Sequence, residues 1–471
     1  MVNAGPSMPS PNVPSPVGNL ALNLGTNATN VYDRPRRVTA ERNLLSFIFF
    51  LAFAGNMFFV SPGVGGVPFR FIAIIILLAG LTAFAAQEVV RAFVSAKAAL
   101  GVIAYLAVAG MLISIFRDQG RPAAVMIISV HLQAVVLLLT IATGTRIIGP
   151  RAMISAFAAA VLISAFFSLM QWLGVPGAFD VRAVLGNVYV DAGDTSVAEN
   201  RAPGLSYSAI LLAEQACLLF SAGMYYSFSK YDGQRNPRWK SIAGWSALLF
   251  AVCMVGGNRS PILGLALFIV VAVSTRNPVL FLITIPTVFA LYLLSDPILH
   301  ALSSSGLRIG ETGDKSSLAR VPLLQYGWRL FLNNPFGYGL TYDSKVLTNT
   351  VQTGDLMAFL SKNLLGDILT RLDIHNNWLI TLNIYGIYLL PVIGYCIYLL
   401  LSKPRMVMLF VPYMVHITVH NAGPFYGDYV FWMTMGIIVG AASLAGSRRE
   451  AFSRANYEPS RTQPAAFIRS T

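Results

Sequence analysis

Long runs of apolar residues, divided by short polar or Gly/Pro-rich breaks, follow one another along most of the chain. A transmembrane helix needs about 20 consecutive, mostly apolar residues. We therefore predict an all-α, polytopic helical bundle with about twelve transmembrane helices. The predicted spans are Leu44–Val60, Phe69–Ala86, Ala98–Phe116, Ala123–Thr143, Ala152–Leu173, Leu205–Phe228, Ile242–Gly256, Ile262–Ser274, Val279–Ser295, Trp378–Leu401, Arg405–His420 and Tyr429–Ala445. The seventh and eighth spans are short and separated only by residues 257–261, so a broken pair, with ten or eleven spans in total, is the alternative.

The spans divide the chain into five segments. Residues 1–43, rich in Pro, Ser and Asn, are expected to form a disordered tail because they cannot bury a core. Residues 44–295 hold the first nine spans, 377–445 hold the last three, and 446–471 form a basic tail. Residues 296–376 form a connection that is too long for an ordinary linker. Within it, the helical apolar spacing of Leu318–Leu332 and Leu356–Leu372 predicts amphipathic helices at the membrane surface.

Composition and charge agree with a membrane protein. Hydrophobic residues make up 55% of the chain and charged residues only 11%, against about 25% in a soluble domain, which excludes a soluble globular protein. The net charge of +13 does not indicate a nucleic-acid partner, because Lys and Arg segregate to one side of the predicted spans. That side carries 20 cations and the opposite short loops carry six. By the positive-inside rule the richer side is the cytoplasm. Both termini then lie in the cytoplasm, and the long connection lies on the outer face.

Three arginines on the predicted outer face are candidates for binding phosphate, which suits the planar guanidinium. Arg201 opens the sixth span, Arg259 lies in the turn between the seventh and eighth, and Arg329 lies in the long loop. The alternative for each is a solvated charge or one that reaches lipid headgroups.

His375 lies where the long loop enters the tenth span and is a candidate general base, because imidazole accepts a proton near neutral pH. Asp373 or Asn376 would fix its tautomer. The alternative is a polar residue at a helix entry with no chemical role.

Other polar groups lie within predicted spans. His416 and His420 share a helix face at the spacing of a metal pair, but no third ligand is evident, and we favour cavity lining or interhelical hydrogen bonding. Glu214 is expected to face the bundle interior, as a partner for one of the arginines beside the site, as the proton-coupling carboxylate of a transporter, or as a protonated structural donor. No nucleotide-binding Gly-rich loop with a following Lys and no CxxC pair occurs. We predict neither a metal nor a cofactor.

Four segments, in order along the chain, resemble motifs of the bacterial O-antigen ligase and polysaccharide polymerase family of membrane glycosyltransferases. Arg201-Ala202-Pro203-Gly204 is similar to the family's Arg-x-x-Gly element, and the turn around Arg259 resembles its Ser-Arg-Gly turn. Residues 333–339 are similar to its Asn-Pro-x-x-Gly-x-Gly segment, and residues 375–386 resemble its His-Asn-x-x-Leu-x-x-Leu-x-x-x-Gly signature. The chain departs from the pattern at three positions, namely Asn258, Pro261 and Asn383.

The resemblance implies a metal-independent glycosyltransferase of the bacterial inner membrane that acts at its periplasmic face. The donor would be an undecaprenyl-diphosphate-linked glycan, and the acceptor another glycan or a lipid. Arg201, Arg259 and Arg329 would bind the diphosphate, and His375 would take the acceptor's proton, with His420 also close by. We favour a polymerase that joins repeat units into exopolysaccharide or O-antigen, with other polysaccharide export proteins as candidate partners. The alternatives are an O-antigen ligase that transfers the glycan to lipid A-core and, from another class, a secondary transporter or lipid-linked glycan flippase that uses Glu214.

Overall fold

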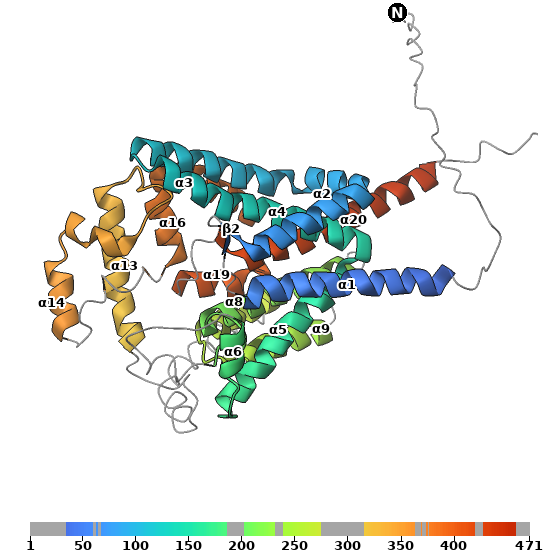
Figure 1. Cartoon of the computed structure of the whole chain (residues 1–471), viewed down its shortest axis with the longest axis horizontal. Helices are drawn as coiled ribbons and strands as arrows, with labels where there is room; N and C mark the ends of the chain where they lie inside the picture. Colours follow the sequence, from blue (N-terminus) through green and yellow to red (C-terminus); the bar gives the residue numbers. More distant parts are fainter. Residues whose placement is uncertain are drawn as a thin grey trace, which may run out of the picture. The chain divides into compact units, whose positions relative to one another are not determined.

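The computed structural model describes residues 34–59, 63–64, 67–185, 202–230, 239–274, 315–362, 369, 374, 376–419 and 427–457. In this part of the chain the regular elements are helices, apart from the paired two-residue strands β1 (Gly63–Val64) and β2 (Val67–Pro68) (Figure 1). The predicted all-helical architecture is therefore confirmed. Contacts divide the chain into two units, Met1–Asn43 and Leu44–Thr471, and the second holds the packed helices.

The helices differ widely in length, and three of them are not α-helical: η1 is a π-helix, and η3 and η4 are 3-10 helices. In chain order they are α1 (Arg34–Phe58), α2 (Phe69–Phe116), α3 (Gly120–Met126), η1 (Ile127–Leu132), α4 (Gln133–Ile148), α5 (Pro150–Trp172), α6 (Asp180–Val184), α8 (Ala209–Lys230), α9 (Trp239–Val255), α10 (Ser260–Ser274), α13 (Lys315–Asn333), η3 (Ser344–Thr350), α14 (Gly354–Lys362), α16 (Asn377–Tyr385), η4 (Gly386–Leu389), α17 (Leu390–Ser402), α18 (Pro404–Met408), α19 (Val411–Val419) and α20 (Tyr429–Tyr457).

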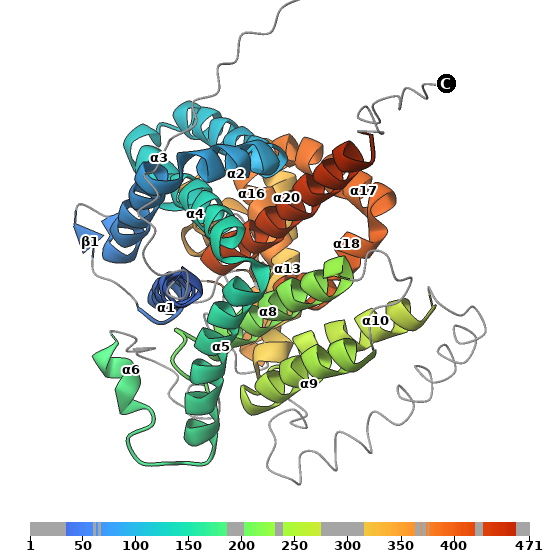
Figure 2. The ribbon, with the colours of Figure 1, turned by 90° about the vertical axis from the view of Figure 1, so that its right-hand side faces the viewer.

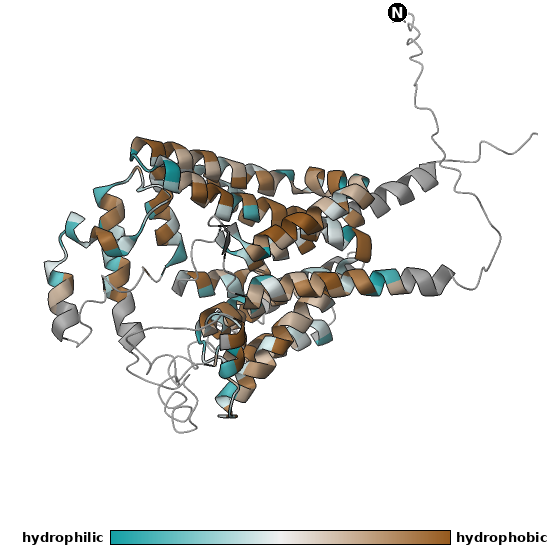
Figure 3. Ribbon diagram, viewed as in Figure 1, coloured by the Kyte–Doolittle hydropathy of each residue, from teal (hydrophilic) through white to brown (hydrophobic). Residues whose placement is uncertain are grey.

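Five helical stretches are long and apolar enough to cross a membrane, as the hydropathy colouring in Figure 3 illustrates. They are Phe69–Phe116, Gly120–Ile148, Pro150–Trp172, Ala209–Phe228 and Asn377–Ser402, and shorter apolar helices cover Lys240–Val255, Ser260–Ala272 and Tyr429–Ala445. These long apolar helices are compatible with a membrane-embedded protein. The count of twelve spans stays a prediction, and its ninth member, Val279–Ser295, lies outside the described residues.

The second and third predicted spans belong to one helical element, α2. The sequence predicts a loop between them because Glu88, Arg91 and Lys97 interrupt the apolar run. In the structure these residues stay helical, and the break lies earlier, at Ala85, whose φ of −143° and ψ of 42° are not helical. A straight helix of 48 residues would be about 72 Å long, more than twice the thickness of a bilayer core. The element has a kink at Ala85 instead, and Figure 1 shows α2 changing direction along its length.

Small residues let the central helices approach closely. α20 packs against α4, and α4 against α2. A Cβ atom on Gly436 would lie 2.8 Å from the Ile141 side chain, and one on Gly440 would lie 2.6 Å from the Ala142 carbonyl oxygen. Glycine at such positions is typical of helix pairs in membranes, where close packing replaces the hydrophobic effect.

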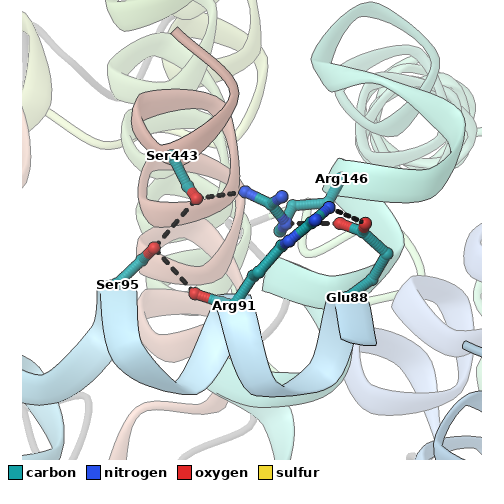
Figure 4. Close-up of polar contacts among 5 residues, drawn as sticks. All are labelled: Glu88, Arg91, Ser95, Arg146 and Ser443. Carbon is teal, nitrogen blue, oxygen red and sulfur yellow. Dashed lines mark hydrogen bonds and ion pairs between the residues drawn. The ribbon is translucent and has the colours of Figure 1, made fainter. Parts of the chain in front are cut away.

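An ion pair between the buried Arg146 and the partly exposed Glu88 joins α4 to α2, and a hydrogen bond to Ser443 extends the contact to α20 (Figure 4). Arg146 Nε donates to Glu88 Oε2 (2.7 Å), and its Nη1 donates to Ser443 Oγ. The same carboxylate accepts from the exposed Arg91 (2.6 Å), and Ser443 also bonds to Ser95 (2.8 Å). Arg91 and Arg146, which meet here, are among the cations that the charge count assigned to a single side of the membrane.

Helical structure also extends into segments that the sequence left irregular. α1 begins at Arg34, inside the predicted disordered tail, and α20 continues to Tyr457, inside the predicted basic tail. In the long loop, α13 confirms the helix predicted over Leu318–Leu332, and α14 covers the first part of the one predicted over Leu356–Leu372.

Candidate functional site

The turn that leads into α8 occupies residues 202–208 and directly follows Arg201, which lies outside the described residues. Gly204 has a φ of 63°, a conformation that favours glycine. A Cβ atom here would overlap the carbonyl oxygen of Ser164 in α5. The Gly204 amide donates to Gln171 Oε1 (2.8 Å), and Gln171 Nε2 donates to the Gly204 carbonyl (2.9 Å). This close contact with α5 explains the glycine of the Arg-Ala-Pro-Gly segment.

Polar side chains of α5 hold the same turn, and the sequence analysis missed them. Ser168 Oγ donates to the Ala202 carbonyl (2.5 Å), and Ser164 Oγ accepts from the Leu205 amide (3.0 Å). Ser164, Ser168 and Gln171 are four and three residues apart, so they share one helix face. A polar stripe on an otherwise apolar span was the signal that could have found them.

Arg182 of α6 is a further cation at this turn. Its buried guanidinium donates from Nη2 to the carbonyls of Ser206 (3.2 Å) and Tyr207 (2.8 Å). The sequence marks Arg182 only as one charge of an outer loop, because no local pattern ties it to residues more than twenty positions away.

Arg259 lies partly buried in the turn between α9 and α10, which run side by side next to α8 (Figure 2). The neighbouring Asn258 amide donates to the carbonyl of the first α8 residue (2.9 Å) and to that of Gly256 (3.0 Å). A Cβ atom on Gly256 would lie 3.9 Å from the Ala202 carbonyl oxygen. The structure therefore brings the segment after Arg201 beside the turn that holds Arg259.

His416 of α19 holds the other side of the Arg259 turn. Its Nδ1 lies 2.9 Å from Ser260 Oγ, and its Nε2 lies 3.0 Å from the Ile210 carbonyl oxygen. Because a carbonyl only accepts, Nε2 carries the hydrogen, and Nδ1 accepts from the Ser260 hydroxyl. The interhelical hydrogen bonding expected of His416 is thus confirmed, whereas His420 lies outside the described residues.

The loop segment 334–339 packs backbone to backbone against the end of α16. The Tyr338 amide donates to the Asn383 carbonyl (2.8 Å), and the Ile387 amide donates to the Pro335 carbonyl (2.8 Å). The third and fourth segments of the family resemblance are therefore in direct contact, although the bonded residues lie more than forty positions apart along the chain.

Glycines make this contact possible. Gly337 and Gly386 have φ values of 91° and 56°. A Cβ atom on Gly337 would lie 2.5 Å from the Ile384 carbonyl oxygen, and one on Gly386 would lie 2.5 Å from the Gly337 nitrogen. Any larger residue would push the loop away from α16.

α19 connects the two pairs of segments, because it packs against α8, α10 and α16. Beside α16 lies an open apolar groove of about 480 Å³ between α13 and α17. It is lined by Leu324, Gln325, Trp328, Asn376, Trp378, Leu379, Leu382, Leu389 and Ile393. The groove thus leads along aromatic and aliphatic side chains to the N-terminus of α16.

Asn376 caps α16. Its Oδ1 accepts from the Leu379 amide (2.8 Å), as a preferred N-cap residue does. Its neighbour His375 and the nearby Asp373 lie outside the described residues, so the tautomer-fixing role expected of Asp373 or Asn376 stays a prediction.

Arg329 joins α13 to α14. Its Nη1 and Nη2 donate to the two carboxylate oxygens of Asp355 (2.7 and 2.6 Å), and Nη1 also donates to the Gln352 carbonyl (2.6 Å). The hydrogen bonds from Arg329 hold the pKa of Asp355 at about 2, and the same bonds raise the pKa of the guanidinium. Diphosphate binding by Arg329 would have to compete with this bidentate pair.

Glu214 lies in α8 and is fully buried beside Asp428, which precedes α20. The expectation that Glu214 faces the bundle interior is confirmed. The sequence did not single out Asp428 as its partner, because the two residues are far apart in the chain.

The turn that follows Arg201 in the chain thus lies beside the turn that holds Arg259, and the loop segment 334–339 lies on the helix that follows His375 in the chain. Among the described residues, no three His, Cys, Asp or Glu side chains come together as metal ligands. No protein-family model and no curated protein sequence matches the chain. Any function must therefore be argued from the site itself.

Proposed function

We propose that the chain is a membrane glycosyltransferase that polymerises undecaprenyl-diphosphate-linked oligosaccharide repeat units. In this proposal it crosses the bacterial inner membrane about twelve times, with both termini in the cytoplasm and the long loop in the periplasm. The product is an exopolysaccharide or O-antigen chain that grows on its lipid carrier.

The observation that carries the proposal is the pairing of four separate segments. The turn after Arg201 lies beside the turn that holds Arg259, and residues 334–339 lie on the helix that follows His375. Segments that merely resembled motifs by chance would have no reason to pack in pairs, with a glycine in each pair at the point of contact.

The apolar groove gives the proposal a place for the lipid. A polyprenyl chain is an apolar polymer that fits a channel lined by Trp328, Trp378 and leucines. Asn376, the chain neighbour of the proposed base His375, is one of the residues that line the groove. A donor lying in it would bring its diphosphate toward the outer ends of the helices.

The chemistry follows from the charges involved. The acceptor hydroxyl oxygen attacks the anomeric carbon of the donor, and the bond from that carbon to the diphosphate oxygen breaks. His375 takes the hydroxyl proton as the new glycosidic bond forms. The lipid diphosphate leaves with increased negative charge, which Arg201 and Arg259 stabilise as fixed cations in a medium of low dielectric constant.

The test uses purified full-length protein in lipid nanodiscs supplied with an undecaprenyl-diphosphate-linked oligosaccharide. Wild type is expected to lengthen the lipid-linked glycan, and His375→Ala, Arg201→Ala and Arg259→Ala are each expected to abolish lengthening. Arg151→Ala, which removes an exposed arginine at the start of α5, is the matched control and should retain it. Full turnover in all three site variants would overturn the assignment.

Two further measurements separate the alternatives. A deletion strain that accumulates single repeat units on the carrier supports a polymerase, whereas long carrier-linked chains without capped lipid A-core indicate a ligase. Glu214→Gln should retain glycan lengthening. If Glu214→Gln instead abolishes transport while His375→Ala remains functional, the protein is a transporter.

A further inference from the structure

Glu214 places a carboxyl group inside the bundle without an ordinary partner. Its relative exposure is 1%, and neither carboxyl oxygen has a hydrogen-bond partner among the described residues. An isolated carboxylate in such a place is costly, so the group must be neutral or bind a cation. Polar side chains within membrane spans are by default functional candidates.

Asp428 lies beside Glu214, and both of its carboxyl oxygens accept hydrogen bonds from other groups. Its Oδ1 accepts from the amides of Val430 (2.9 Å) and Phe431 (3.0 Å) at the start of α20, and its Oδ2 accepts from the Tyr413 hydroxyl (2.9 Å). All three partners donate, so Asp428 acts as an acceptor at both oxygens.

Glu214 therefore faces a second carboxyl group, whose oxygens accept hydrogen bonds, in a buried place. Two ionised carboxylates in contact repel strongly where water is excluded, and such pairs hold a proton between them. A proton on Glu214 removes the repulsion and supplies the hydrogen bond that its oxygens otherwise lack.

We propose that Glu214 and Asp428 form a proton-binding site within the membrane-spanning bundle, in which Glu214 carries the proton and donates it in a hydrogen bond to Asp428. The site rests on no part of the proposed glycosyl transfer. Removal of the proton by hydroxide yields water and leaves two carboxylates, with no other bond changed.

The surroundings favour a proton over a metal cation. The other titratable groups that face this region are Tyr413 and His416 of α19, Cys217 of α8 and Cys253 of α9. A hard divalent cation takes six or more oxygen ligands. The described residues offer the oxygens of two carboxyl groups and one phenol here.

The proton also links structural elements. Glu214 belongs to α8, whereas Asp428 caps α20 and is held by α19 through Tyr413. When the proton leaves, like charges face each other across this junction. The junction between α8 and α20 is therefore expected to loosen at alkaline pH.

Infrared spectroscopy of the purified full-length protein tests the site directly, because a protonated carboxylic acid has a carbonyl band apart from those of carboxylates. At pH 7 the wild type should show this band, and Glu214→Gln should lose it. Asp355→Asn is the matched control, since Asp355 is ionised at pH 7 and its removal should leave the band in place. Asp428→Asn should retain the band at a shifted position. This variant tests the proposal even if Glu214→Gln fails to fold.

Thermal unfolding in detergent provides the second measurement. The unfolding temperature of wild type should fall between pH 7 and pH 10 by more than that of Glu214→Gln, whose amide still donates to Asp428.

Absence of the infrared carbonyl band in wild type, or its persistence in Glu214→Gln, would refute the proposal. A stabilisation by sodium chloride over choline chloride that disappears in Glu214→Gln would also refute it and assign a metal-cation site instead.

Discussion

Replacement of Gly386 by alanine is expected to separate the loop segment 334–339 from α16. Gly386 has a φ of 56° and a ψ of −141°, a region that only glycine occupies readily. An alanine there costs about 1–3 kcal/mol in backbone strain. Its Cβ atom would also overlap the Pro335 carbonyl oxygen and lie 2.5 Å from the Gly337 nitrogen.

The overlap can be relieved only if the two backbones move apart. That movement breaks the hydrogen bonds from Ile387 to Pro335 and from Tyr338 to Asn383, each worth about 1 kcal/mol. Strain and lost bonds together amount to roughly 3–5 kcal/mol, which favours local opening of the loop by at least about a hundredfold.

Hydrogen exchange followed by mass spectrometry measures this opening at the amides of Tyr338 and Gly339. We expect exchange of this peptide in Gly386→Ala to be faster by that factor. Gly394→Ala is the matched control, because it lies within α17 and has no atom within 4 Å of the added Cβ. It should leave exchange unchanged, since alanine is a better helix former than glycine. Equal protection in Gly386→Ala and wild type would show that the glycine contact does not hold the loop.

Two ion pairs allow further predictions. Glu88→Gln leaves the buried Arg146 without its charged partner and should lower stability by about 3 kcal/mol, seen as a lower unfolding temperature in detergent, whereas loss of the exposed partner in Arg91→Ala should cost less than about 1 kcal/mol. Because bonding to Arg329 lowers the pKa of Asp355 to about 2, the pair is fully formed above the ordinary aspartate pKa and is lost only as the pH falls through about 2. The difference in unfolding temperature between wild type and Asp355→Asn should therefore be constant from pH 5 to pH 8, and a change within that range would contradict the assigned pairing.

The sequence predicts helix boundaries well where a long apolar run defines the helix, and poorly where charged residues interrupt such a run. Glu88 and Arg91 led to a predicted loop because isolated charges do not belong in a span. In the structure they remain helical, since Glu88 binds Arg146 of another helix and Arg91 binds Glu88 one turn away on its own helix. Arg146 lies far along the chain from Glu88, and no local pattern contains it.

In the candidate site, too, some residues could be recognised from the local sequence and others could not. The glycines and arginines of the four segments could be found from the sequence, because turns and phosphate sites use characteristic residue types. Arg182 and Asp428 could not, because their importance comes only from what the fold brings to them. Arg182 meets the carbonyls of residues 206 and 207, and Asp428 meets Glu214.

In the segments that follow Arg201 and His375 in the chain, glycines allow close backbone contacts, and side chains of α5 also hold the turn at Gly204. Gly204 and Gly386 each let one chain segment lie directly on another, and each is within a few turns of a proposed site residue. A larger residue at either position would displace the site without removing a charge. Variants at these glycines should therefore lower turnover while lipid-diphosphate binding, measured with a non-hydrolysable analogue, weakens much less than in Arg259→Ala. Equal losses of binding in both kinds of variant would mean that the backbone contacts place the arginines themselves.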